Sequence, residues 1–101
     1  MTTMAVFDFE GDTDALIERY DEVLSKVVAV SSGRPVIHLA VPREYGLMVC
    51  DVWDSETALD AFVANDEFHR VMAEGGLPAP KLRRYPVHHL GWPVAEMPLY
   101  R

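Results

Sequence analysis

Two polar residues in neighbouring predicted strands, His38 and Asp51, are of the types that perform acid–base chemistry. The segment VIHLAVP (residues 36–42) carries the histidine, and GLMVCDVW (residues 46–53) carries the aspartate. Both segments are rich in the apolar and β-branched residues that favour strands. The REYG sequence that joins them has the length of a hairpin connection, so we expect the two strands to pair.

The length of this connection also predicts which residues face each other. A register that pairs Pro42 with Leu47 places His38 directly opposite Asp51, and opposed residues share one face of a sheet. Asp51 could then orient His38 and raise its basicity, as an orienting carboxylate does for a general base. The alternative is a buried histidine with no catalytic role that only forms a hydrogen bond with Asp51. An unpaired carboxylate is costly to bury, so Asp51 needs a partner in either case. A slip of one residue in either direction would separate the pair.

A third candidate, Tyr85, lies in RRYPVHHL (residues 83–90), which we predict to be the last strand. We expect the first and third strands to run parallel, which would place Asp8 and Asp51 at one end of the sheet. The other two strands run the opposite way, so His38 and Tyr85 are expected at that end too. Tyr85 could donate a proton to a substrate oxygen or serve as an interface aromatic. Asp8 could be a site carboxylate or a solvated residue at a strand end.

Two adjacent histidines, His88 and His89, follow in the same predicted strand. Neighbouring side chains of a strand point to opposite faces, so the two cannot bind one ion. We expect at most one of them, with His88 favoured, to line a pocket. The chain has no HxxxH, CxxC or HxH spacing, so no metal site is predicted.

The pattern of apolar residues predicts helices between these strands. Asp12 or Thr13 can cap the first helix, which SSGRP (residues 31–35) ends. DSET (residues 54–57) begins the second helix, and Asn65-Asp66 resembles a further cap, so a separate short helix is expected after it. The first helix carries one apolar stripe at three- and four-residue steps, formed by Leu16, Ile17, Tyr20, Val23, Leu24, Val27 and Val28.

With the strand MAVFDF (residues 4–9) at its start, the order of elements is β-α-β-β-α-β. This is the ferredoxin-like split pattern of the α+β class, a sandwich of a four-stranded antiparallel sheet with two helices on one face. Its usual strand order is 4-1-3-2, in which the last strand is an edge that tolerates Pro86.

The predicted strands are apolar on both faces, although helices cover only one. We therefore predict a homodimer that packs sheet against sheet, as in a dimeric α/β barrel. A single domain is expected over residues 1–101, with a core of about 3–92 and a C-terminal tail at 93–101. The segment that ends the chain is expected to reach across to the partner, and its large apolar residues are Trp92, Met97, Leu99 and Tyr100.

The composition excludes several classes of partner. A formal net charge of −7 argues against nucleic acid and anionic membranes, because phosphate binding needs clustered Lys and Arg. No apolar run is long enough to span a bilayer, and the N-terminus does not read as a signal peptide. The single cysteine, Cys50, allows no internal disulfide and is most simply a small core residue. A soluble cytoplasmic protein is expected.

The segment VWDSETALDAFVANDEFHRVM (residues 52–72) follows a strand that ends in Trp with a Ser-initiated helix and a short aromatic-containing helix. Together with the topology, over residues 3–92, this resembles the dimeric α/β-barrel superfamily, in particular antibiotic-biosynthesis-monooxygenase-like domains. The superfamily includes cofactor-independent oxygenases of aromatic polyketides, heme-degrading enzymes, isomerases and cyclases. The heme-degrading members have a Trp and a His at two helical positions. This chain has Phe62 and Met72 at those positions, so heme binding is not expected.

The resemblance and the residues together imply a small cofactor-independent enzyme, monooxygenase-like or else an isomerase or cyclase. It would act on a small hydrophobic, aromatic or polyketide-type substrate between the sheet and the helices. No GxGxxG, P-loop or flavin signature is present, and no cofactor is predicted. The alternative is a non-catalytic homodimer that binds a small molecule or acts as an accessory protein. His38, Asp51 and Tyr85 are the candidate catalytic residues, and Trp53, Phe62, Phe68, Met72 and His88 are the candidate substrate-binding residues.

Overall fold

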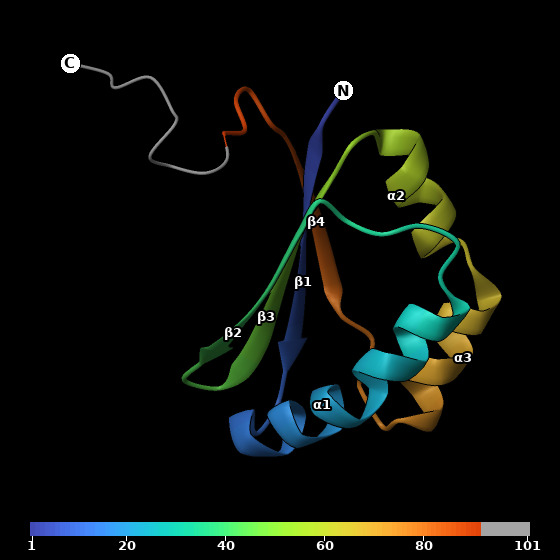
Figure 1. Cartoon of the computed structure of the whole chain (residues 1–101). Helices are drawn as coiled ribbons and strands as arrows, with labels where there is room; N and C mark the ends of the chain where they lie inside the picture. The colour runs from blue at the N-terminus through green and yellow to red at the C-terminus, as the bar shows by residue number, and fades with distance from the viewer. Residues whose placement is uncertain (92–101) are drawn as a thin grey trace.

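A computed structural model describes residues 1–91, and the elements of that part of the chain follow the predicted order. They are β1 (Thr3–Glu10), α1 (Thr13–Val30), β2 (Ile37–Arg43), β3 (Gly46–Trp53), α2 (Glu56–Val63), α3 (Asp66–Glu74) and β4 (Lys81–Pro86) (Figure 1). The ferredoxin-like α+β fold is confirmed, including the division of the second helical region into α2 and α3.

The four strands form one antiparallel sheet in the order β2-β3-β1-β4, as predicted. The expectation that the first and third strands run parallel is wrong: β1 pairs with β3 antiparallel, with Asp8 opposite Met48 and Ala5 opposite Asp51. The reason is topological. In a split βαβ unit β1 and β2 run the same way, and the strand inserted between them runs against both. Asp8 and Asp51 therefore lie at opposite ends of the sheet.

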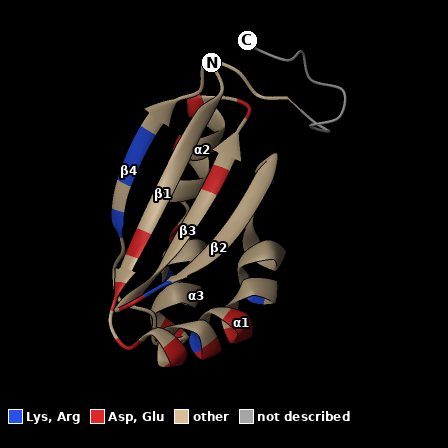
Figure 2. Cartoon of the chain, turned by 90° about the vertical axis from the view of Figure 1, so that its left-hand side faces the viewer, with Lys and Arg blue, Asp and Glu red and all other residues tan. Residues whose placement is uncertain are grey.

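Within the described residues, 1–91, all three helices lie on one side of the sheet and none covers the other face (Figure 1). Figure 2 looks onto this open face, with the helices behind the strands. Between the sheet and the helices lies one hydrophobic core, to which alternate residues of the two central strands contribute. Its members include Ala5, Phe7 and Phe9 of β1, Leu47, Val49 and Trp53 of β3, and Leu16, Val23, Leu59 and Val71 of the helices.

The helices begin where the sequence predicts caps. The side chain of Asp12 accepts a hydrogen bond from the backbone N–H of Ala15 at the start of α1. Ser55 and Asn65 cap α2 and α3 in the same way. A cap of this kind stabilises a helix by about 1 kcal/mol, because it satisfies one of the N–H groups that has no partner within the helix.

One side chain ties the start of α1 to the β2–β3 hairpin. The hydroxyl of Thr13 donates to the carbonyl of Arg43 at 2.6 Å and accepts from the N–H of Gly46 at 3.0 Å. Tyr20 lies seven residues further along, about two helical turns, and so on the same side of α1 as Thr13. The tie therefore directs the tyrosine toward β2 and β3.

The last strand differs from the prediction. It spans Lys81–Pro86 rather than residues 83–90, and Val87 to Leu90 lie outside it. Pro86 is opposite Thr3, the first residue of β1, and one further backbone bond runs from the N–H of Val87 to the carbonyl of Thr2 at 3.0 Å, so the residues after Val87 have no part of β1 to pair with. His88 and His89 are thus not strand residues, and strand alternation does not divide them between two faces. The tail residues expected to contact a partner, from Trp92 on, lie outside the described part of the chain.

Within residues 1–91, none of the helices has both the length and the apolar character needed to cross a membrane.

Candidate functional site

Three polar side chains from three elements form a continuous hydrogen-bonded chain. The Nδ1 atom of His38 lies 2.5 Å from Oδ1 of Asp51, and its Nε2 atom lies 2.5 Å from the hydroxyl of Tyr20. The predicted register holds, because β2 and β3 pair His38 with Asp51 directly. The rings of Tyr20 and His38 are nearly parallel, with an angle of 7° between their planes. We call the three residues the Tyr20–His38–Asp51 relay.

Burial and charge determine where the protons of the relay reside. The Asp51 side chain is 5% exposed, whereas that of His38 is 33% exposed. The hydrogen bond that His38 donates to Asp51 raises the pKa of His38 above its ordinary value, against the opposing effect of desolvation. Burial, and then the charge of Asp51, raises the pKa of the Tyr20 phenol. With neutral His38, Tyr20 therefore donates to Nε2, and Nδ1–H donates to Asp51.

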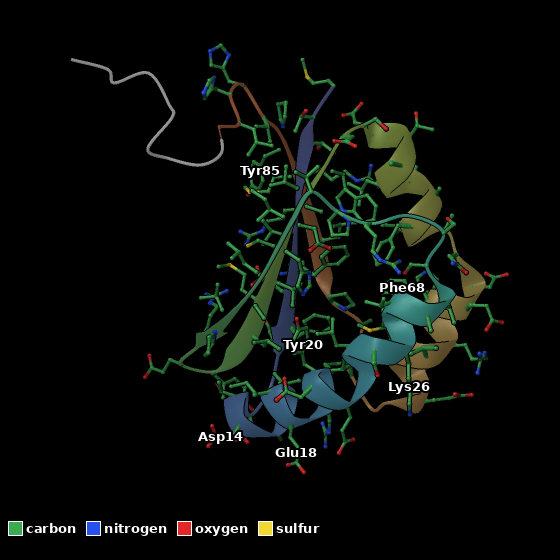
Figure 3. All side chains as sticks on the ribbon, in the orientation of Figure 1. Asp14, Glu18, Tyr20, Lys26, Phe68 and Tyr85 are labelled. Atoms are coloured by element: carbon green, nitrogen blue, oxygen red, sulfur yellow. The ribbon has the colours of Figure 1, made fainter. Side chains whose placement is uncertain are left out.

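The relay borders an apolar cavity of about 60 Å³ between the sheet and α1 and α3. Figure 3 shows Tyr20 and Phe68 within the space that the sheet and helices enclose, while Asp14 and Glu18 point away from the sheet. Apart from the relay, the cavity is lined by hydrophobic side chains, which are Phe7, Phe9, Val23, Leu24, Val27, Val49, Phe62, Phe68, Met72 and Leu77. A few convergent polar groups in an apolar hollow are typical of small-molecule sites.

Three of the predicted substrate-binding residues, Phe62, Phe68 and Met72, line this cavity. Trp53 does not line it. The indole is 1% exposed and packs on Phe62 with a centroid distance of 5.0 Å, so it supports the cavity wall from behind. Its Nε1 has no hydrogen-bond partner among the described residues. His88 is exposed beyond the end of β4 and does not contribute to the cavity.

Tyr85 lies on the other face of the sheet. Its neighbour Arg84 bonds to Asp60 of α2 at 2.5 Å, so Arg84 faces the helices and the side chain of Tyr85 points away from them. Figure 3 shows Tyr85 on the side of the sheet opposite to Tyr20. The predicted grouping of Tyr85 with His38 therefore fails, although both lie at the same end of the sheet. The remaining prediction for Tyr85, an interface aromatic, fits its 42% exposure.

Asp8 is a structural residue at the opposite end of the sheet. Its carboxylate bonds to Arg43 at 2.8 Å and to Arg83 at 2.5 Å, linking β1 to β2 and to β4. This arrangement satisfies the carboxylate and leaves it far from the relay in the sheet register.

Tyr20 was not among the predicted site residues, because its spacing places it within the apolar stripe of α1. One signal was available: it is the single residue of that stripe with a polar atom. A buried tyrosine hydroxyl usually finds a partner, which predicts a polar group opposite it.

Asp51→Asn is expected to lower the pKa of His38 below its ordinary value of 6.5, because the negative charge that stabilises the cationic imidazole is lost while desolvation remains. The histidine Cε1–H resonances, followed by NMR across a pH titration, measure the change. Asp60→Asn is the matched control, because it removes a carboxylate of α2 that bonds to Arg84 and not to His38. An unchanged His38 titration in Asp51→Asn would show that the two side chains do not interact in solution.

No family model and no curated protein sequence matches the chain, whereas solved structures do. SnoaB, a cofactor-independent oxygenase from Streptomyces nogalater, has a TM-score of 0.65 at 13% identity, over 91% of this chain and 97% of that one. A candidate antibiotic biosynthesis monooxygenase from Chloroflexus aurantiacus gives 0.60 at 18% identity, over 90% and 98%. Rv0793 from Mycobacterium tuberculosis gives 0.65 at 16% identity, over 90% and 100%. These similarities confirm the resemblance to antibiotic-biosynthesis-monooxygenase-like domains at the level of the fold.

Proposed function

We propose that this protein is a small cofactor-independent enzyme, monooxygenase-like, that removes a proton from a hydrophobic aromatic or polyketide-type substrate. The observation that carries the proposal is the Tyr20–His38–Asp51 relay, with 2.5 Å between each pair of bonded atoms, at the border of an apolar cavity. The fold shared with a cofactor-independent oxygenase supports the same reaction class.

The relay gives the substrate proton a defined route. The acidic O–H or C–H of the substrate transfers its proton to the Tyr20 oxygen while the proton of Tyr20 moves to Nε2 of His38. Because its pKa is raised, Tyr20 is a neutral phenol at rest and transmits the proton rather than storing a charge. The proton remains on His38, whose cationic form Asp51 stabilises. The partly exposed imidazole can then return it to water or to a product oxygen.

The resulting carbanion reacts with dioxygen without a cofactor. Transfer of one electron gives a substrate radical and superoxide, which combine into a C–O bond, and protonation completes a hydroperoxide. When a CH₂ group of the substrate becomes a carbonyl, one oxygen atom of the dioxygen stays on the carbon. The other oxygen atom leaves as water together with the two hydrogens of the CH₂ group.

Oxygen consumption with anthrone, a tricyclic substrate with an acidic CH₂ group, tests the proposed reaction. Tyr20→Phe removes only the hydroxyl and is expected to reduce the rate by about 10²-fold, the lower range for loss of a proton-transfer group. Tyr45→Phe is the matched control, since Tyr45 is 72% exposed on the hairpin. If Tyr20→Phe consumes oxygen as fast as the wild-type protein, the substrate reaches His38 directly and the relay is not the route. If the wild-type protein gives no oxygen uptake above buffer, anthrone oxygenation is excluded.

We also propose that the open face of the sheet pairs with a second copy of the chain. Strand alternation places Met4, Val6, Met48, Cys50 and Val52 on this face, together with Ile37, Leu39 and Val41 of β2. Leu39 is 54% exposed and Val41 37%. An apolar sheet face without a described helix over it, exposed along its outer strand β2, is typical of an interface.

Val41→Glu is expected to make the protein monomeric, because the carboxylate would be buried without a partner between the two sheets. Val28→Glu is the matched control. Val28 has nearly the same exposure, 40%, but lies on α1, on the other side of the sheet. Sedimentation equilibrium measures the mass of each variant. A wild-type protein that sediments as a monomer at micromolar concentration would contradict the proposed dimer.

A further inference from the structure

The cavity beside the relay is too small for the proposed substrate. Its volume is about 60 Å³. A dry protein cavity that accepts a single benzene measures about 150 Å³. An aromatic molecule can therefore place only its reacting end beside Tyr20 and His38, and its body must lie elsewhere.

A second cavity of about 390 Å³ adjoins the first. It lies between α3, the segment 77–80 that follows this helix, and Leu82 of β4. Its volume is within the range of small-molecule sites, about 300–1,000 Å³. The two cavities share four lining residues, Phe7, Phe68, Met72 and Leu77, so these side chains border both of them.

The wall residues differ in how firmly they are held. Phe68 is 7% exposed and its ring packs on Phe62 with a centroid distance of 4.5 Å. Met72 is only partly buried and has an unbranched side chain with three rotatable bonds. A change of its rotamer requires no movement of α3. Met72 is therefore the side chain best suited to open a passage between the cavities.

The lining of the larger cavity defines the chemistry of its occupant. Among the described residues that line it, His69 has the one polar side chain, and Nε2 of His69 donates to the carbonyl of Val63 at 2.6 Å. The other lining residues carry neither charge nor a polar side-chain group. A charged group would lose its hydration there without gaining a partner, so the cavity selects a neutral apolar body.

We propose that the substrate is an elongated, neutral hydrophobic molecule that spans both cavities and displaces Met72. Its acidic group lies in the small cavity beside Tyr20, and its apolar body fills the large cavity under α3. The assignment of the acidic end rests on the proposed function, whereas the binding of the apolar body does not.

Calorimetric titration with 4-ethyl-, 4-butyl- and 4-hexylphenol, without oxygen, tests the proposal. Each methylene buried in the large cavity is expected to raise the affinity about fourfold. Ala73→Phe, which places a ring at the wall of the large cavity, should remove this dependence on chain length. Ala61→Phe, on an exposed position of α2 that lines neither cavity, should preserve it. The methyl resonance of Met72 should shift on binding of the longer phenols.

An affinity independent of chain length, or the same dependence in Ala73→Phe and Ala61→Phe, would overturn the proposal. Its outcome is separable from that of the proposed function. Chain-length-dependent binding with no oxygen uptake from any phenol or anthrone leaves the two-cavity site standing and removes the oxygenase. Oxygen uptake together with an affinity that does not depend on chain length would support the oxygenase and remove the two-cavity site.

Discussion

His38→Asn is expected to lower kcat/KM for oxygen consumption by about 10²–10⁴-fold, the usual contribution of a general base. The amide nitrogen of asparagine takes approximately the place of Nδ1 and can still donate to Asp51, which His38 meets at 2.5 Å. No basic nitrogen replaces Nε2, so the proton received through Tyr20 has no acceptor. The measurement is the initial rate of oxygen uptake across a range of anthrone concentrations.

Binding of the alkylphenols to His38→Asn serves as the control, because it should remain within about threefold of the wild-type affinity if the cavity is intact. Loss of turnover with retained binding separates an enzyme from a small-molecule-binding protein. A His38→Asn variant that keeps more than a tenth of the wild-type rate would mean that His38 is not the base.

His38→Ala is expected to destabilise the fold much more than His38→Asn. Removing one partner of a buried ion pair typically costs about 3–5 kcal/mol, because the other charge stays buried without compensation. Asp51, with a side chain 5% exposed, is the charge left behind. We expect the lower end of that range, since His38 is 33% exposed and water can enter the space it leaves. Urea unfolding at neutral pH measures the difference from the wild-type protein.

The loss in His38→Ala should also depend on pH. In the wild-type protein the raised pKa of His38 contributes stability that is complete below its ordinary pKa of 6.5 and is lost as the pH rises through the folded-state value. His38→Ala lacks this contribution at every pH. The difference in stability between the two proteins should therefore be largest below about pH 6.5 and should narrow as the pH rises through the folded-state pKa of His38, and a difference that does not change with pH would contradict the raised pKa.

Much of the candidate site follows from local sequence. The pairing of His38 with Asp51 is set by the short connection between two strands and by the two-residue period of a strand. The caps Asp12, Ser55 and Asn65 are equally local, because each side chain bonds to a backbone N–H two or three residues away. Local interactions of this kind are determined within a few residues, and their outcome could be predicted.

Long-range packing decided the rest. Tyr20 meets His38 because α1 docks over β2 and β3, held by Thr13 and by the burial of Leu16 and Val23, and no local pattern determines the rotation of a helix about its axis. The face that Tyr85 occupies depends on the pairing of β4 with β1, more than seventy residues apart in the chain.

The sequence by itself therefore determined the order of the elements and the acid–base pair at the hairpin. The tertiary structure decided the third member of the relay, excluded Tyr85 and Trp53 from the cavity wall, and set the sizes of the two cavities. The physical reason is that register and capping are specified by neighbours in the chain. A cavity, in contrast, is what remains after side chains from distant elements have packed against one another.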